Sequence, residues 1–203
     1  MTDAAPSPGP RRSAAQRLRE VARELFYKQG IRATGVEELC RVAGTTKISL
    51  YRAFPSKDEL VAAILRDDCE QEAGWYEKAI GSGLPPRQRP AAFLAAAVAE
   101  LRQPGFRGCS LCLAIAELPD PNHPARQVAD AYKRQMRDDL RRICAEAGVA
   151  DPDMLGDTLT MLTEGAFSSA AYLGAEQAAA SLERAGGALL EQALAGMGTR
   201  SGE

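Results

Sequence analysis

The sequence is poor in the residues that build metal and membrane sites. It has one histidine, His123, and aromatic residues make up only 5% of its 203 residues. A single histidine excludes a metal site built from several imidazoles. No run of 18 or more apolar residues occurs, which excludes a membrane-spanning helix. Residues 1–12 lack the apolar core of a secretory signal, so we expect a cytoplasmic location.

Cysteine is present, but not in the pattern of a disulfide framework. The five residues are odd in number and scattered: Cys40, Cys69, Cys109, Cys112 and Cys144. Reduced, buried thiols fit this usage best. Cys109-Ser-Leu-Cys112 has the CxxC spacing of a redox dithiol or of half a metal site. A metal would need a second Cys or His pair, which the sequence lacks, so packing of both thiols on one helix face is favoured and thiol sensing stays an alternative.

The net charge of −2 is unevenly distributed along the chain. Residues 1–60 contain 11 Lys and Arg against 7 Asp and Glu, a net charge of +4. Residues 61–203 contain 14 against 20, a net charge of −6. The N-terminal part is therefore suited to a polyanionic partner and the remainder is not.

Apolar residues recur at intervals of three and four from Ser13 onward, and no segment shows the alternation of a β-strand. This predicts an all-α fold of about nine helices. Thr34 with Glu37 and Ser56 with Glu59 have the spacing of capping boxes, so a helix is expected to start at each. We expect a disordered tail over residues 1–12, a helix-turn-helix DNA-binding domain over 13–60, and a larger helical domain over 61–203.

The stretch Ala43-Gly-Thr-Thr-Lys-Ile-Ser-Leu-Tyr-Arg-Ala-Phe54 predicts the reading helix of that domain. Gly44 ends one helix, Thr46 caps the next, and Leu50 and Phe54 point inward at i, i+4. The other faces then carry cationic and hydroxyl groups, the groups that bond to phosphates and base edges in a major groove.

The same residues resemble the DNA-binding signature of the tetracycline-repressor (TetR) family of transcriptional regulators. The likeness runs over residues 14–65 and includes a Gly turn, Thr-Lys, Leu-Tyr and Phe-x-Ser-Lys. The resemblance implies a homodimer on a palindromic operator and no enzymatic activity or cofactor. The DNA contacts it implies, together with the capping residue of the reading helix, are Thr34, Thr46, Lys47, Ser49, Tyr51, Arg52 and Lys57. Gly35, Ile48 and Ala53 depart from the commonest residues of the signature.

Two apolar stripes on the helix expected over residues 152–173 favour dimerisation independently. A helix that is apolar on two sides must be covered on two sides. One stripe contains Leu155, Leu159, Leu162, Ala166 and Ala170, and the last helix adds Leu182, Ala185 and Leu189; these eight residues are the predicted dimer interface. A roughly opposite stripe contains Met154, Met161, Gly165, Ser168 and Tyr172.

The resemblance also implies an effector pocket in the C-terminal domain. Candidate lining residues are Trp75, Phe93, Phe106, Leu111, Ile115, Tyr132, Met136, Met161, Glu164 and Phe167. A small-molecule effector is expected to favour a dimer whose reading helices no longer match the DNA, which releases the repressor. A regulator that switches through Cys109 and Cys112 and a small dithiol enzyme are the alternatives. The enzyme is disfavoured because one histidine supplies no catalytic triad and no strand precedes the CxxC.

Overall fold

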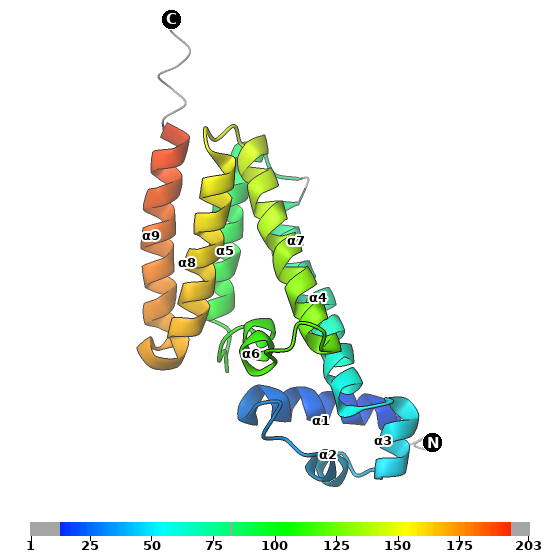
Figure 1. Cartoon of the computed structure of the whole chain (residues 1–203). Helices are drawn as coiled ribbons and strands as arrows, with labels where there is room; N and C mark the ends of the chain where they lie inside the picture. Colours follow the sequence, from blue (N-terminus) through cyan, green and yellow to red (C-terminus); the bar gives the residue numbers. More distant parts are fainter. Residues whose placement is uncertain (1–12, 82, 196–203) are drawn as a thin grey trace, which may run out of the picture. The chain divides into compact units, whose positions relative to one another are not determined.

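The structure, a computed structural model, describes residues 13–81 and 83–195, without the side chains of residues 71–75, 78 and 79. The described residues form nine α-helices, one short 3-10 helix (Pro86–Gln88) and no strand, which confirms the all-α prediction (Figure 1). The helices are α1 (Ala14–Gln29), α2 (Val36–Val42), α3 (Lys47–Ala53), α4 (Lys57–Ile80), α5 (Arg89–Leu101), α6 (Ser110–Glu117), α7 (Pro124–Glu146), α8 (Pro152–Leu173) and α9 (Ala175–Ala195). The expected tail, residues 1–12, lies outside the described residues.

The chain divides into two compact units after Ile64, within α4, a few residues beyond the expected boundary at residue 60. α1, α2 and α3 pack on one another in the first unit. Leu18, Ala22 and Phe26 recur every four residues of α1 and are buried. Leu39 of α2 and Leu50 of α3 are also fully buried. The core of this unit is thus one apolar face from each short helix.

The starts of α2 and α4 show which capping residues act. Ser56 Oγ accepts the N–H of Glu59 at 3.0 Å, so α4 begins where the sequence predicts. The capping box predicted at Thr34 is wrong. The residue before α2 is Gly35, which makes no side-chain capping bond, and the Thr34 hydroxyl donates to Gly30 O at 2.8 Å instead.

The second unit is a helical bundle in which α5, α7, α8 and α9 run side by side and α6 packs on α7 (Figure 1). α7 and α8 approach so closely at Gly156 that a Cβ there would lie 2.8 Å from the backbone N of Arg141. No helix in the described part of the chain is both long enough and apolar enough to cross a bilayer.

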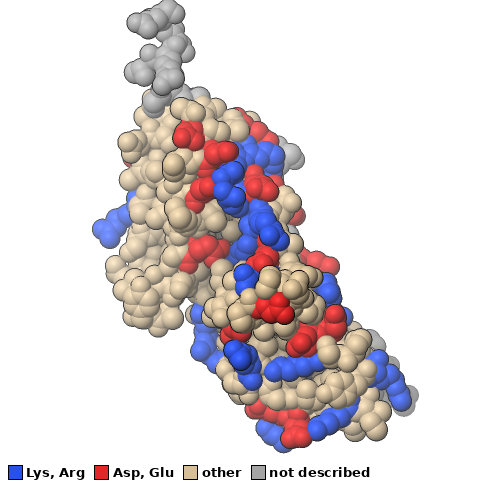
Figure 2. All heavy atoms as spheres, in the orientation of Figure 1, with Lys and Arg blue, Asp and Glu red and all other residues tan. Residues whose placement is uncertain are grey.

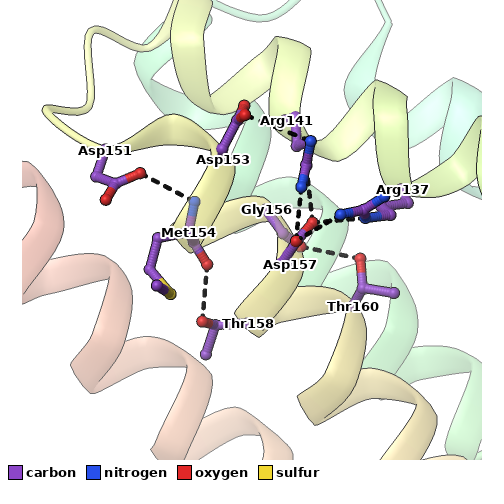
Figure 3. Close-up of polar contacts among 9 residues, drawn as sticks. All are labelled: Arg137, Arg141, Asp151, Asp153, Met154, Gly156, Asp157, Thr158 and Thr160. Carbon is purple, nitrogen blue, oxygen red and sulfur yellow. Dashed lines mark hydrogen bonds and ion pairs between the residues drawn. The ribbon is translucent and has the colours of Figure 1, made fainter.

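One carboxylate fastens α8 to α7 beside this close approach. Asp157 accepts bidentate hydrogen bonds, all 2.7 Å long, from the guanidinium groups of Arg137 and Arg141 (Figure 3). These bonds lower the pKa of Asp157 well below its usual range. Figure 2 shows such oppositely charged groups interleaved along α7. The abundant charge of this helix therefore serves pairing within the bundle.

Candidate nucleic-acid interface

The turn between α2 and α3 is built around Gly44, which has a φ of +59°. The N–H of Thr45 donates to Cys40 O at 2.9 Å, and that of Gly44 to Arg41 O at 3.4 Å. These are the two bonds of a Schellman motif, whose left-handed residue is usually glycine. Thr46 Oγ1 then accepts the N–H of Ser49 at 3.2 Å, which confirms the predicted cap of α3. The outcome is a helix-turn-helix with a turn over residues 43–46.

α3 has one buried and one exposed side. Leu50 is fully buried and Phe54, just after the helix, keeps 5% of its surface. By contrast, Ile48 is 74% exposed and Tyr51 is 50% exposed. Also exposed are Thr46, Lys47 and Arg52, whereas Ser49 is half-buried. A seven-residue helix thus presents two cations, hydroxyl groups and an aliphatic side chain on one surface.

Lys47 forms an exposed ion pair with Glu37 of α2. Its Nζ lies 2.6 Å from Glu37 Oε1, and the two side chains are 53% and 84% exposed. The hydrogen bond lowers the pKa of Glu37 and raises that of Lys47, so both groups are charged at neutral pH. An exposed pair of this kind is easily exchanged for another partner, such as a phosphate.

Two of the predicted DNA contacts are engaged inside the domain. Thr34 is fully buried, so the assignment of its side chain as a DNA contact is corrected: its hydroxyl serves the loop after α1. Lys57 Nζ donates to Ile31 O at 2.5 Å and lies 5.9 Å from the centre of the Phe26 ring. Lys57 therefore ties the start of α4 to the end of α1.

Ile48 is the surface residue that the sequence-based assignment missed. A large aliphatic side chain with 74% of its surface exposed is unusual beside the polar groups of α3. The available signal was its departure from the small residue or proline common at this position of the signature. An exposed aliphatic group on a reading helix is suited to the methyl group of thymine.

The two stripes of α8 have different surroundings in the protomer. Four residues of the predicted interface are buried among the protomer's own helices: Leu155, Leu159, Ala170 and Leu182. Three are half-buried, namely Leu162, Ala166 and Leu189, and Ala185 is exposed. The opposite stripe is the exposed one: Met154 is 63%, Met161 66% and Tyr172 77% exposed. The surface over α8 and α9 is largely uncharged in Figure 2. The apolar face left uncovered is thus the second stripe.

Ring contacts join several of the predicted pocket residues to one another or to Tyr76. The centre of the Tyr76 ring lies 6.4 Å from that of Phe93 and 6.2 Å from that of Tyr132. Phe106 packs edge-on against Phe167, with 5.1 Å between the ring centres. Leu111 and Met136 are buried, and Ile115 is half-buried. Met161 points to the surface, which corrects its assignment to a pocket wall. The Trp75 side chain lies outside the described residues.

Glu164 lies in a polar cluster instead of facing an aromatic wall. Its Oε1 lies 2.7 Å from Lys133 Nζ of α7, and its Oε2 accepts from the Cys112 thiol of α6 at 2.6 Å. In the described residues, no group of three or more His, Cys, Asp or Glu has a geometry that could hold a metal ion.

Comparison with known proteins finds the same architecture in bacterial regulators. The family described as bacterial regulatory proteins, tetR family, matches residues 18–64. SCO4454, a TetR-family transcriptional regulator from Streptomyces coelicolor, is similar with a TM-score of 0.84 and 29% identity over 89% of this chain and 96% of that one. The protein sav143 of Streptomyces avermitilis MA-4680, described as a tetR transcriptional regulator, has a TM-score of 0.78 and 33% identity over 90% and 98%. The repressor KstR2 of Rhodococcus jostii is 39% identical over 70 residues, 34% of each chain, so the match spans about a third of that relative.

Proposed function

Because the chain belongs to the TetR family of transcriptional regulators, we propose that it is a homodimeric repressor that reads a palindromic operator through α3. The observation that carries the proposal is the exposed surface of α3 behind the Gly44 turn, with Lys47, Ile48, Tyr51 and Arg52 available to a ligand. Cations and hydroxyl groups on the N-terminal part of such a helix bond to phosphates and base edges in the major groove. Repression is supported by the likeness of 70 residues of this chain to the KstR2 repressor.

The test is selection of duplexes from a randomised DNA library by the purified full-length chain. We expect an inverted repeat whose half-sites lie about one helical turn, or a multiple of it, apart, because each copy presents one α3. Enrichment of a non-repeated sequence would contradict the dimer, and absence of any enrichment at low salt would contradict the DNA-binding proposal itself.

We propose that the second copy covers the exposed stripe of α8. Met154, Met161 and Tyr172 form an apolar surface, and the neighbouring helix α9 adds the exposed Ala185 and Ala188. Exposed apolar groups in a row are typical of interfaces between copies. Met161→Asp should convert the dimer to a monomer by light scattering. The matched control is Leu113→Asp on α6, an exposed apolar residue outside the stripe, which should leave the dimer intact. A dimer that persists in Met161→Asp would contradict this seam.

We further propose that the C-terminal unit binds an effector with a hydrogen-bonding group. Thr163 of α8 is 1% exposed, and its hydroxyl has no hydrogen-bond partner among the described residues. A buried polar group without a partner costs roughly 1–3 kcal/mol, which a ligand that bonds to it would recover. Thr163→Val should therefore weaken the binding of a co-purified or screened effector about fivefold or more, measured by calorimetry, and should leave DNA binding unchanged. Unchanged effector affinity would remove Thr163 from the site.

A further inference from the structure

The second unit contains a cluster of two thiols, a cation and a carboxylate that the proposed DNA contacts do not include. Cys109 is the residue before α6, and Cys112 lies on the first turn of that helix. Lys133 of α7 and Glu164 of α8 face the same point, with Lys133 Nζ 2.7 Å from Glu164 Oε1. The Lys133 and Glu164 side chains keep only 17% and 25% of their surface exposed. All five cysteines are free thiols, and Cys109 and Cys112 share a cationic and an acidic neighbour, Lys133 and Glu164.

The two thiols differ in their proton affinity. The neighbouring Cys112 side chain, with help from the Lys133 charge, lowers the pKa of Cys109 despite burial. The Cys109 side chain, together with burial, raises the pKa of Cys112. Burial opposes the charge on Lys133, but Cys109 and Glu164 outweigh it and raise the pKa of the ammonium group. These directions favour a thiolate on Cys109 and a proton on Cys112.

From this geometry we propose that Cys109 and Cys112 are a peroxide-oxidised dithiol site, in which Lys133 holds the Cys109 thiolate and Glu164 receives the proton of Cys112. The Cys112 thiol already donates to Glu164 Oε2 at 2.6 Å, so the proton acceptor is in place. Lys133 and Glu164 are positioning residues, because they act through the sulfur atoms.

The chemistry balances with hydrogen peroxide as the oxidant. The Cys109 thiolate attacks one peroxide oxygen, an S–O bond forms, the O–O bond breaks, and the leaving hydroxide takes up a proton from solvent to become water. Cys112 then passes its proton to Glu164 and attacks the Cys109 sulfenic sulfur. The S–S bond forms, the S–O bond breaks, and the leaving hydroxide takes the proton from Glu164. The two thiols are oxidised to a disulfide, and peroxide is reduced to water.

Closing this disulfide changes the contacts at the start of α6. A disulfide holds its two Cβ atoms about 3.5–4.5 Å apart, so the residue before α6 becomes fixed to the first turn of that helix. The bond from the Cys112 thiol to Glu164 is lost, because the thiol gives up its proton. Cys109 keeps 6% of its surface, so a small uncharged oxidant suits the site better than a bulky thiol reagent.

The test treats the full-length chain with hydrogen peroxide at neutral pH, removes the oxidant, alkylates the remaining thiols in denaturant and maps the peptides by mass spectrometry. We expect an unalkylated disulfide between Cys109 and Cys112, with Cys40, Cys69 and Cys144 alkylated, and recovery of both thiols after dithiothreitol. Cys112→Ser should stop the reaction at a Cys109 sulfenic acid that dimedone traps. Alkylation of both Cys109 and Cys112 after Cys69 has been oxidised would overturn the proposal.

Variants of the neighbours distinguish a reactive site from buried packing. Lys133→Met should slow disulfide formation about tenfold or more, because the thiolate loses its cation, and Lys133→Arg should restore most of the rate. Glu164→Gln should let the sulfenic acid accumulate. Cys144→Ser, at a buried thiol whose pKa is raised by burial, is the control and should react as wild type. A wild-type rate in Lys133→Met refutes the role of the cation; if that variant fails to fold by circular dichroism, the dimedone result decides. No readout involves DNA, so failure here leaves the repressor proposal untouched.

Discussion

The Lys47–Glu37 ion pair yields the sharpest prediction about DNA binding. If Lys47 exchanges Glu37 for a phosphate, Lys47→Ala removes one phosphate contact per copy. Each contact contributes about 0.9 to the slope of log affinity against log salt, so two copies lose about 1.8. Between about 50 and 200 mM salt, the affinity gap between wild type and variant should therefore shrink about tenfold. Glu37→Gln should bind more tightly than wild type at low salt, because Lys47 no longer has to leave a carboxylate.

The assay is fluorescence anisotropy with a selected duplex at several salt concentrations. α1 provides a matched control: Lys28 and Glu24 are also 2.6 Å apart and have side-chain exposures of 58% and 64%. Lys28→Ala and Glu24→Gln should leave the slope as in wild type. Equal slopes for Lys47→Ala and wild type, or equal slope changes for Lys47→Ala and Lys28→Ala, would refute the phosphate contact.

Three further predictions concern specificity and stability. Ile48→Ala should lower the discrimination between bases at one base pair of each half-site at least about fivefold, the lower end of a typical single-pair effect. The assay is competition binding with single-base variants of the selected duplex, and an unchanged base preference would contradict the contact with a thymine methyl group. Gly156→Ala should lower the free energy of unfolding in urea by about 1–3 kcal/mol, because its Cβ meets the Arg141 backbone. Gly187→Ala, with no atom within 4 Å of its Cβ, is the control and should be neutral or stabilising. Equal effects would contradict the close packing of α7 on α8. The lowered pKa of Asp157 stabilises the fold at pH values above the ordinary aspartate pKa of about 4, and that contribution is lost as the pH falls further. The thermal stabilities of Asp157→Asn and wild type should therefore converge in acid. A constant difference would contradict the pairing of Asp157 with Arg137 and Arg141.

Local signals in the sequence were sufficient for the helices and the turn. Gly44, Thr46 and Pro55 punctuate the chain over short distances, and the structure places α3 between the last two. The spacing of Thr34 and Glu37 was misleading, since the Thr34 hydroxyl bonds to a carbonyl four residues before it, which spacing alone does not encode. Local pattern therefore predicts where helices lie better than which polar group caps them.

The side of a helix that faces its neighbours was harder to predict. Both stripes of α8 are apolar in sequence, and only the packing of α8 between α7 and α9 shows that Leu155 is inside and Met161 outside. The contact of Cys112 with Glu164 joins residues 52 positions apart, so no local pattern contained it. Pairing across helices requires the three-dimensional arrangement.

The most direct test of α3 as the reading element is an equilibrium titration of the selected duplex with Tyr51→Ala beside wild type. Tyr51 is half exposed and lies outside the core, so its removal should leave helicity and oligomeric state unchanged. We expect the affinity for the selected duplex to fall at least about tenfold while the weak affinity for unrelated DNA stays nearly the same. Wild-type affinity and selectivity in this variant would contradict the account.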